Sequence, residues 1–403
     1  MNWIDVVSAG PGSEDFLTAG ARRALDEAQA VFCAERNRDL VRDQAACRPL
    51  TPFSRALDSM ETLRAEGLRV AVLLSGDAGL YSLLPILTER FGRESLRVHP
   101  GVSSLQAFCA KLGVPWQKAA ILSAHGKQLT SSALCHTVQS HFMTLLLLDG
   151  DHDPRWIRQS LDNGGLENAR ITVGEKLSYP DERIGVWENR EYDPLSVALI
   201  ENDTAGRQSR AVALPDDAFV RGKTPMTKRE IRAQIAAELN LPPDAVVWDI
   251  GAGTGSVTVE CALQCPFGQV FPVERDPEAL KLISENIRRF HLQNAEPVPG
   301  SAPEALDGLP SPTHVFLGGT GGRAAEILSL LESLGTPVRL CATAVTLESM
   351  QEYFALLRDQ KDFSAVQIAV SRAEAAGSYH MLRAQNPVYV FSAEICGKAK
   401  EQA

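Results

Sequence analysis

Two glycine-rich segments, one at the N-terminus and one past the midpoint, constrain the fold of this chain more than any other feature. The first is Gly10-Pro11-Gly12, which follows the apolar pair Val6-Val7. The second is Gly251-Ala252-Gly253-Thr254-Gly255, which follows the apolar run at residues 246–250. Glycine is needed where a backbone turns sharply and approaches a ligand, and a following helix offers free N–H groups. Each segment therefore predicts a small-molecule site at the carboxyl end of a strand in an α/β domain.

Length and charge narrow the class of protein. A chain of 403 residues exceeds the usual domain size of ~100–200 residues, so we expect two domains. The net charge of -10 argues against a nucleic-acid surface, which needs a basic stripe. An anionic substrate would need positive charge gathered locally in a pocket, because the overall field of the protein would repel it.

The cysteines and the apolar runs of the sequence indicate the cellular compartment in which we expect the protein. The eight cysteines show no metal or redox spacing, and free cysteines fit a reducing cytosol. The chain enters an apolar strand at once, without the charged and apolar leader of a secreted protein, and its longest apolar run, residues 145–148, cannot span a bilayer. We therefore expect a cytoplasmic protein with no membrane or nucleic-acid partner.

Hydrophobic periodicity predicts two α/β series. We expect a first domain over residues 1–200, a linker over residues 201–223, where turn formers such as Asn202, Gly206 and Pro215 gather, and a second domain over residues 224–403. In the first domain, strands are expected at residues 3–8, 30–33, 69–74, 96–99 and 144–148 and helices at 17–28, 54–66, 80–91 and 104–112. In the second, strands are expected at 246–250, 269–273, 314–317, 338–342, 365–370 and 388–392, and helices at 277–290 and 346–357.

The spacing of the second glycine segment separates two nucleotide cofactors. A dinucleotide fingerprint would place its third glycine at position 256, where this chain has Ser256; the third glycine is Gly255. The pattern Asp-x-Gly-x-Gly-x-Gly, beginning at Asp249, favours S-adenosylmethionine. Glu274, at the end of the next expected strand, can accept hydrogen bonds from both ribose hydroxyls. From these residues alone, an NAD-linked oxidoreductase stays an alternative.

Further segments of the second half resemble the class I methyltransferase family that methylates C15 and decarboxylates a corrin precursor in cobalamin biosynthesis. The resemblance covers roughly residues 224 to 393 and is carried by the glycine loop and by Pro225-Met226-Thr227-Lys228-Arg229-Glu230-Ile231-Arg232, Gly300-Ser301-Ala302-Pro303-Glu304, Val315-Phe316-Leu317-Gly318-Gly319-Thr320-Gly321-Gly322 and Asn386-Pro387-Val388. It implies a Rossmann-like fold and an S-adenosylmethionine site lined by Thr227, Gly251, Ala252, Gly253, Thr254, Gly255, Glu274 and Ala302.

In the first half, four glycine turns follow one another at strand ends. They are Gly10-Pro11-Gly12, Ser75-Gly76-Asp77, Pro100-Gly101-Val102-Ser103-Ser104 and Ser123-Ala124-His125-Gly126. Their order and spacing resemble the tetrapyrrole methylases, a separate S-adenosylmethionine fold, and within it the branch that methylates C5 of a corrin precursor. The resemblance covers residues 1 to about 190 and implies a cofactor site lined by Gly10, Gly76, Asp77, Leu80, Ser104 and Leu105, with Ala124 and His125 nearby.

Two departures from the tetrapyrrole methylase pattern stand out. Ala78 occupies a position where the family usually has proline, and Asp149-Gly150-Asp151-His152 is more acidic than expected beside an anionic substrate. His125 is either a general base or, as we favour, a residue that bonds the backbone or packs on the cofactor. No third ligand accompanies His136 and His141, so we expect no metal site.

The two resemblances together imply one enzyme that converts precorrin-6B to precorrin-8, with C5 and C15 methylation and loss of the ring C acetate carboxyl, using one S-adenosylmethionine per domain. Such methyl transfer needs alignment and exclusion of water more than a nucleophilic side chain. Lys228 and Arg232 lie four apart on one helical face and are candidates for holding substrate carboxylates. Glu260 is a candidate proton carrier. The alternatives are a solvated helix start for the two cations and a structural role for Glu260.

Two other possibilities for the function stay open at this stage. The same chemistry could act on the cobalt-containing precursor of the anaerobic route, because that metal would be carried by the substrate. One domain could be catalytic and the other a tetrapyrrole-binding module. Both families commonly self-associate, so we expect a homo-oligomer whose partner, besides its own copies, is the tetrapyrrole substrate.

Overall fold

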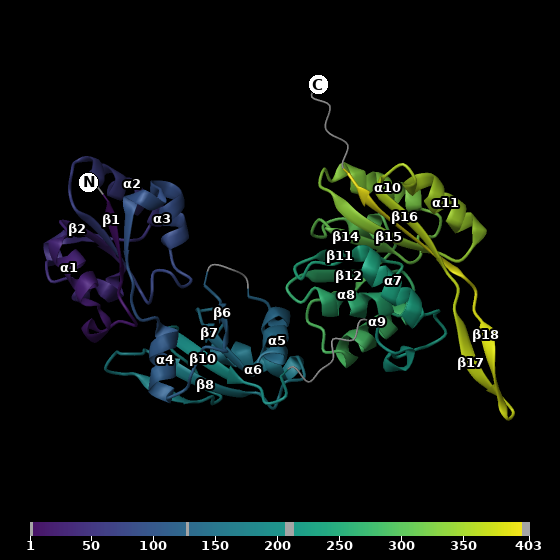
Figure 1. The fold of residues 1–403 in the computed structure, drawn as a ribbon, viewed down its shortest axis with the longest axis horizontal. Helices are drawn as coiled ribbons and strands as arrows, with labels where there is room; N and C mark the ends of the chain where they lie inside the picture. The colour runs from purple at the N-terminus through teal and green to yellow at the C-terminus, as the bar shows by residue number, and fades with distance from the viewer. Residues whose placement is uncertain (1–2, 126–128, 206–212, 397–403) are drawn as a thin grey trace, which may run out of the picture. The chain divides into compact units, whose positions relative to one another are not determined.

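The computed structural model describes residues 3–125, 129–205 and 213–396. Within it, the chain forms two compact units, one built mostly from residues 1–208 and the other mostly from residues 209–403 (Figure 1). Both are mixed α/β structures, which confirms the predicted fold class. No helix in these ranges is long and apolar enough to cross a membrane.

The first unit begins with a parallel five-stranded sheet in the order β3-β2-β4-β1-β5. Strand β4 is a fully buried run of valine, alanine and leucine, and β1 is buried except at Asp5, as expected for a sheet covered on both faces. Ile4 and Val6 pack into one core and Val7 into the other, because successive side chains of a strand point to opposite faces. The elements are β1 (Ile4–Ser8), α1 (Ala19–Glu27), β2 (Ala30–Cys33), β3 (Cys47–Pro49), α2 (Phe53–Ala65), β4 (Val70–Leu74), α3 (Leu84–Phe91) and β5 (Leu96–His99).

A second sheet of the first unit is mixed, with the order β6-β7-β10-β8-β9. Strand β10 pairs antiparallel with both β7 and β8. Helix α4 enters through a capping box, in which the Ser103 side chain accepts from the Gln106 N–H and the Gln106 side chain accepts from the Ser103 N–H. The elements are α4 (Ser104–Leu112), β6 (Ala120–Ser123), α5 (Ser131–Ser140), β7 (Met143–Leu147), α6 (Pro154–Asn163), β8 (Arg170–Glu175), β9 (Arg183–Val186) and β10 (Ser196–Glu201).

The second unit contains a seven-stranded sheet in the order β13-β12-β11-β14-β15-β19-β16. The strands from β13 to β15 are parallel, and β19 is antiparallel to both of its neighbours. The chain reverses its direction of winding at β11, between β12 and β14, which is where α/β sheets bind ligands. The elements are α7 (Arg229–Leu239), β11 (Val246–Ile250), α8 (Ser256–Gln264), β12 (Gln269–Glu274), α9 (Pro277–Arg289), β13 (Val298–Pro299), β14 (His314–Leu317), α10 (Ala324–Ser333), β15 (Val338–Ala344), α11 (Leu347–Leu357), β16 (Lys361–Ile368) and β19 (Val388–Ile395).

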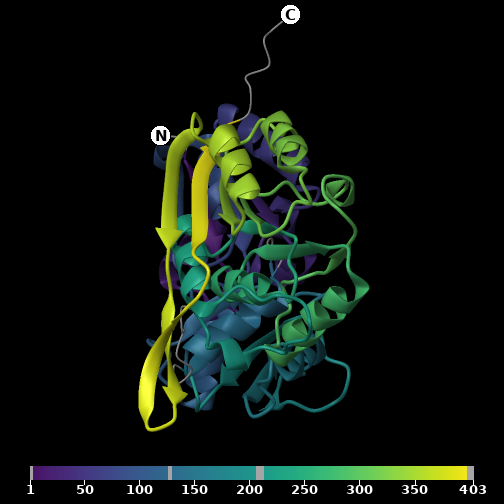
Figure 2. The ribbon, with the colours of Figure 1, turned by 90° about the vertical axis from the view of Figure 1, so that its right-hand side faces the viewer.

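A two-stranded hairpin continues from this sheet. Strands β17 (Ser371–Ala376) and β18 (Tyr379–Ala384) pair with each other and with no other described strand, and they extend beyond the seven-stranded sheet (Figures 1 and 2). All of β18 is exposed, including Tyr379, Met381 and Leu382. The sequence did not predict this hairpin, because its alternation has no buried face.

Part of the expected linker is folded into the second unit. Ala213 and Phe219 are buried, and the Val220 N–H donates to Asn286 Oδ1 of α9 at 2.7 Å. Residues 201–205 continue from β10, and residues 206–212 lie outside the described residues. The linker expectation is therefore wrong for residues 213–220. Its turn formers suggested solvent exposure, but here they shape a loop that packs on helices.

Candidate active sites

The glycine turns of the first unit meet at the carboxyl edge of the parallel sheet. Gly10 and Gly76 exchange backbone hydrogen bonds of 3.1 and 2.8 Å, and both have positive φ, near 70°. A Cβ on Gly10 would lie 2.5 Å from the Phe16 Cβ, so only glycine fits there. The Asp77 carboxylate accepts from the Gly79 N–H at 2.8 Å and the Gly101 N–H at 2.9 Å, which ties two of the turns together.

These turns border a cavity of about 300 Å³ within the first unit. Of the cofactor residues inferred from the resemblance, the cavity wall contains Gly10, Gly76, Asp77, Leu80, Ser104 and His125. Leu105 and Ala124 do not line it. Leu105 is 2% exposed and packs in a core with Phe108, while Ala124 is also 2% exposed. Each neighbours a wall residue in the sequence, Ser104 and His125 respectively, and the expected contact of Leu105 with the cofactor and the expected position of Ala124 near it stay predictions.

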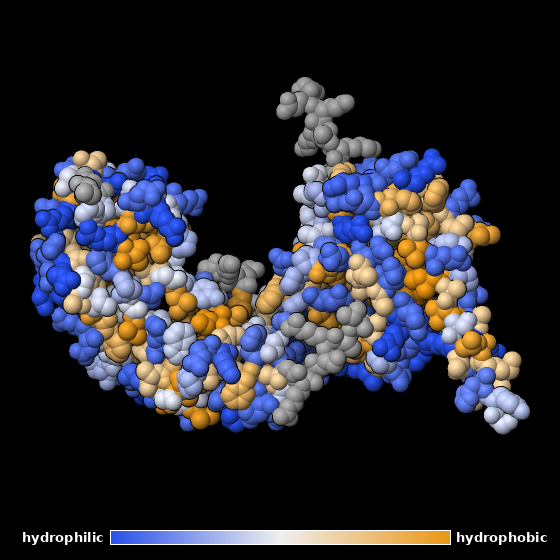
Figure 3. Space-filling model, in the orientation of Figure 1, coloured by the Kyte–Doolittle hydropathy of each residue, from blue (hydrophilic) through white to orange (hydrophobic). Residues whose placement is uncertain are grey.

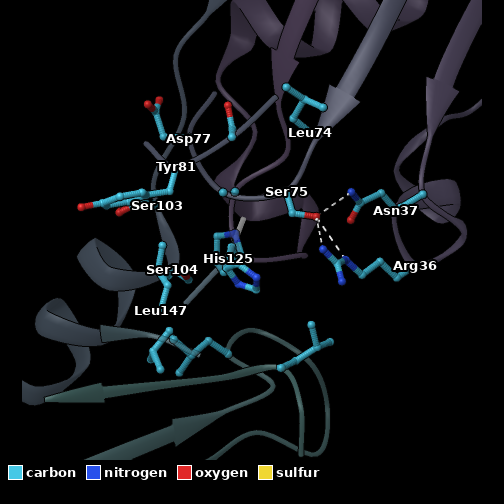
Figure 4. A pocket seen from close by; sticks show the side chains of 18 of the residues that line it. Arg36, Asn37, Leu74, Ser75, Asp77, Tyr81, Ser103, Ser104, His125 and Leu147 are labelled. Carbon is cyan, nitrogen blue, oxygen red and sulfur yellow. Dashed lines mark hydrogen bonds between the residues drawn. The ribbon is translucent and has the colours of Figure 1, made fainter. Parts of the chain in front are cut away.

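A polar cluster on the cavity wall was not predicted. Arg36 and Asn37, which follow strand β2, both reach the Ser75 hydroxyl at the end of β4 (Figure 4). The signal was present in the sequence, since both strands are apolar and parallel and their carboxyl ends lie side by side. Single-sequence reasoning missed it because Arg36 stands in a charged stretch without a glycine, where a solvated surface is the common outcome.

His125 lies exposed at the same wall. Its backbone N–H donates to Ser123 Oγ at 3.1 Å, which holds the turn after β6. Desolvation by the surrounding protein lowers the pKa of the imidazole; the Asp149 charge opposes this, and the Arg36 charge adds to it. The side chain is therefore neutral at neutral pH. This agrees with a packing or hydrogen-bonding role more than with a permanently charged one.

The acidic segment after β7 is internally compensated. Asp149 Oδ1 accepts from the backbone N–H groups of Asp151 and His152 and lies 2.9 Å from His152 Nδ1. These contacts lower the pKa of Asp149 despite its partial desolvation. The negative charge is held by its own loop.

In the second unit, the glycine loop after β11 packs against a second glycine turn after β14. Gly251 has φ of 72°, and a Cβ there would lie 2.3 Å from the Gly319 carbonyl oxygen. The two backbones can approach only because Gly251 lacks a side chain, whereas a Cβ on Gly319 would have no described atom within 4 Å. Beside them is a cavity of about 370 Å³, lined by Ile250, Gly251, Val273, Glu274, Arg275, Gly300, Ser301, Ala302, Gly319, Thr320, Gly321 and Arg323.

Three of the predicted cofactor residues, Gly251, Glu274 and Ala302, line this cavity. Glu274 closes the loop, because its Oε2 accepts from the Gly253 N–H at 3.0 Å while Oε1 accepts from the N–H groups of Arg275 and Asp276. The other predicted cofactor residues of this unit do not line the cavity. They are Ala252, Gly253, Thr254 and Gly255, together with Thr227, whose carbonyl oxygen is held by Arg232.

The candidate catalytic pair Arg232 and Glu260 occupies the interior. The Arg232 side chain is 0% exposed and pairs with Asp216 at 2.9 Å and Glu260 at 3.2 Å, and it also donates to the carbonyl oxygens of Thr227 and Leu214. Glu260 further accepts from the N–H groups of Ala213 and Leu214. The expectations that Arg232 holds substrate and that Glu260 carries a proton are therefore wrong, since neither group can reach a ligand.

Lys228 differs from Arg232. It is the N-cap residue of α7 and is partly exposed. The spacing of four residues suggested that Lys228 and Arg232 share one helical face. In the structure, Lys228 lies at the start of α7 and Arg232 is buried in the interior. Lys228 is thus the one member of the predicted catalytic set that a ligand can reach.

Asp249 is completely buried beneath the glycine loop and accepts a hydrogen bond from Thr258 Oγ1. Desolvation raises its pKa to about 7, and the nearby Glu274 charge acts in the same direction. Within the described part of the chain, the other carboxylate oxygen, Oδ1, has no hydrogen-bond partner, and neither has the hydroxyl of Thr254. The buried acid therefore joins the end of β11 to helix α8 through Thr258.

Comparison with known proteins agrees with this division of the chain. Residues 4–193 match the family model of the tetrapyrrole (corrin/porphyrin) methylases, and residues 217–395 match that of the precorrin methyltransferase domain. A precorrin-6Y C(5,15)-methyltransferase (decarboxylating) from Sinorhizobium sp is 30% identical over 358 residues, which cover 85% of each chain. A cobalt-precorrin-6B C(15)-methyltransferase (decarboxylating) from Salmonella typhimurium is 35% identical over 185 residues, 45% of this chain and 95% of that protein.

Among solved structures, the precorrin-6Y C5,15-methyltransferase from Geobacter metallireducens is 35% identical, covers 45% of this chain and 96% of its own, and has a TM-score of 0.43.

Proposed function

The chain belongs to the family of decarboxylating precorrin-6Y C5,15-methyltransferases, and on this premise we propose how its two units divide the work. It is an S-adenosylmethionine-dependent methyltransferase of cobalamin biosynthesis that methylates a corrin precursor at C5 and C15 and decarboxylates it. We assign C5 methylation to residues 1–200 and C15 methylation with decarboxylation to residues 224–403. The observation that carries this assignment is the presence of one cavity at the carboxyl edge of the parallel sheet in each unit.

Each cavity has features that suit S-adenosylmethionine, and we propose one cofactor site per unit. In the second unit, the Gly251 and Gly319 turns leave a wall free of side chains, and Glu274 stands at the end of β12, where a carboxylate can accept from ribose hydroxyls. In the first unit, Gly10, Gly76 and Ser104 form the corresponding backbone wall. When bound, the cofactor supplies an electrophilic sulfonium methyl group.

The chain's own contribution to methyl transfer is then positional. The walls of both cavities align the cofactor with a nucleophilic ring carbon and exclude water, and no covalent intermediate with a side chain is needed. Asp77 fixes the two turns on which the first wall depends. Lys228, partly exposed at the start of α7, is our candidate for holding a substrate carboxylate during decarboxylation.

We propose precorrin-6B as substrate and precorrin-8 as product. A cobalt-containing precursor is the second candidate, because the Salmonella relative of the second unit acts on a cobalt-precorrin by its name. Turnover of metal-free and cobalt-loaded substrate by the same preparation distinguishes them. The eight free cysteines suit the reducing cytoplasm in which we propose that the enzyme works.

We also propose that the protein is a homo-oligomer that associates through the β17–β18 hairpin. Tyr379, Met381 and Leu382 are 76%, 64% and 75% exposed, and hydrophobic side chains along this hairpin are visible in Figure 3. Among the described residues, the outer edges of β17 and β18 have no strand partner. Unpaired edges with exposed apolar residues favour pairing with another chain. Sedimentation of the native protein and of a Met381→Lys, Leu382→Lys variant tests this: we expect the variant to be smaller, and an unchanged mass would refute the hairpin as the interface.

Calorimetric titration with S-adenosylhomocysteine tests the two-site proposal directly. We expect two sites per chain. Asp77→Asn is expected to weaken one site and Gly251→Ala the other, which assigns each site to its unit. A single site in the native protein would show that one unit is a binding module without a cofactor.

A further inference from the structure

A surplus of hydrogen-bond donors gathers at one point of the first cavity wall. Ser75 Oγ lies 3.2 Å from Arg36 Nε, 3.0 Å from Arg36 Nη2 and 3.0 Å from Asn37 Nδ2 (Figure 4). A hydroxyl oxygen has two acceptor lone pairs, so it cannot satisfy three N–H donors. A carboxylate has about four acceptor positions and receives a guanidinium with two parallel hydrogen bonds. The donor set therefore matches a carboxylate better than the hydroxyl that it now contacts.

The charges on the wall lead to the same ligand. Among the residues that the structure describes, the lysine and arginine side chains along the cavity are Arg36 and Lys176, and Lys176 is already paired with Asp181 at 2.6 Å and Asp193 at 3.2 Å. Arg36 is exposed, and among the described residues it has no acidic side chain at ion-pairing distance. Arg36 is thus a positive charge available for an anion. The net charge of -10 repels anions from the protein as a whole, so an anionic ligand needs such a local positive charge.

The cluster is also held in place. Asn37 is 1% exposed, so its amide cannot turn away into solvent. Ser75 is fixed by the adjacent Gly76, which is bonded to Gly10 from both sides. A guanidinium whose neighbours are fixed loses less conformational freedom on binding than a free surface arginine.

From this arrangement we propose that Arg36, Asn37 and Ser75 form a carboxylate subsite that binds one acetate or propionate side chain of the tetrapyrrole in the C5-methylating unit. The inference rests on the proposed function and adds a substrate-binding residue to it. The cofactor also carries a carboxylate, but Figure 4 shows Arg36 and Asn37 on the other side of Ser75 from Asp77, Tyr81, Ser103 and Ser104. Of these, Asp77 and Ser104 belong to the wall that we assign to the cofactor.

The test uses the full chain and three variants. Arg36→Gln removes the charge, and Arg36→Lys keeps the charge but cannot form two parallel hydrogen bonds to a carboxylate. Arg90→Gln is the control. Arg90 is an exposed arginine of α3 that pairs with Asp58 and Glu61 and does not line the cavity. Substrate is turned over with S-adenosylmethionine labelled with ¹³C in the methyl group. The C5 and C15 methyl groups of the product give separate resonances, so the C15 reaction is an internal control in every sample.

We expect Arg36→Gln to raise the KM for tetrapyrrole in C5 methylation about tenfold or more, equivalent to about 1.4 kcal/mol, with C15 methylation unchanged. Arg36→Lys should lie between this variant and the native protein, and Arg90→Gln should match the native protein. The affinity of the first unit for S-adenosylhomocysteine should stay within about twofold in all three variants.

Two results would overturn the subsite. An unchanged KM in Arg36→Gln would show that no substrate carboxylate uses this cluster, and a loss of S-adenosylhomocysteine affinity as large as the rise in KM would assign it to the cofactor. Both differ from failure of the proposed function itself, in which the native first unit would bind no S-adenosylhomocysteine and form no C5 methyl product.

Discussion

The backbone N–H of Ala78 donates a hydrogen bond of 2.9 Å to the Ser8 hydroxyl, joining the turn after β4 to the end of β1. Both residues are buried, at 1% and 0% exposure. Proline, which the tetrapyrrole methylases usually have at this position, could not donate this bond because it has no N–H. Alanine at position 78 therefore allows a hydrogen bond to Ser8 that proline would not, and this bond holds the turn beside Asp77.

This contact predicts a specific thermodynamic cycle. Ser8→Ala leaves the Ala78 N–H buried without a partner and should cost about 1–3 kcal/mol of unfolding free energy. Ala78→Pro removes the donor instead, and Ser8→Ala should then cost clearly less in the Ala78→Pro background than in the native protein. Urea unfolding of the four proteins measures the coupling. Equal costs of Ser8→Ala in both backgrounds would mean that the bond contributes nothing.

Gly251 provides a sharper test of the second cofactor site. Gly251→Ala places a Cβ 2.3 Å from the Gly319 carbonyl oxygen and strains a residue with φ of 72°. The two glycine turns must then separate, and we expect S-adenosylhomocysteine affinity in the second unit to fall by about tenfold or more.

Gly308→Ala is the matched control for this change. Gly308 has φ of 78°, so alanine meets the same backbone strain, about 1–2 kcal/mol, but its Cβ has no atom within 4 Å among the described residues. It should lower stability and leave cofactor affinity unchanged. If the two variants bind S-adenosylhomocysteine equally well, the close approach of the glycine turns has no part in the site.

Much of the architecture could be predicted because burial leaves a pattern in the sequence. The strands at residues 30–33, 96–99, 246–250 and 314–317 begin and end where expected. The helix expected at residues 80–91 begins only at Leu84, because the preceding residues form a turn on the cavity wall. Pro85 suits the first turn of this helix, where a missing N–H costs no hydrogen bond. The β17–β18 hairpin could not be predicted, since its strands are almost entirely exposed and bury no face against a core.

The candidate sites show the same limit. Glycines mark a close backbone approach wherever they occur, so Gly10, Gly76 and Gly251 could be found from the sequence. A charged residue in a sequence does not indicate whether its side chain is buried in an ion pair or exposed at a site. Arg232 and Arg36 look alike in the sequence, yet one is a fully buried ion-pair partner and the other an exposed cation on the cavity wall. Their roles depend on contacts between segments far apart in the chain, which periodicity does not encode.

The burial of Arg232 predicts a large effect on stability. Arg232→Met leaves Glu260 buried without its guanidinium and Asp216 with Arg372 alone, and it should cost about 3–5 kcal/mol. Lys281→Met, which breaks an exposed helical pair with Glu278, is the control and should cost about 0.5 kcal/mol or less. Urea unfolding followed by circular dichroism compares them. Similar small losses in both variants would show that Arg232 is not a structural residue and would restore it as a candidate for binding substrate.

Asp249 predicts how stability depends on pH. Its pKa rises from 3.8 in the unfolded chain to about 7 in the folded protein, chiefly through desolvation. A raised pKa in the folded state means that the folded protein holds a proton that the unfolded chain releases, so the contribution of Asp249 to stability is fully present below about pH 4 and is lost as the pH rises to about 7. Carboxyl groups with lowered pKa values, such as those of Asp216 and Glu230, act in the opposite direction and below this window.

Asp249→Asn removes this titration while keeping an oxygen that can accept from Thr258. The difference in unfolding free energy between the native protein and Asp249→Asn should therefore move in favour of the variant as the pH rises from about 4 to about 7, and level off above that. Urea unfolding of both proteins across this range measures it. A constant difference would mean that Asp249 is ionised in the folded protein, so that Thr258 donates to a buried charge instead of a neutral acid.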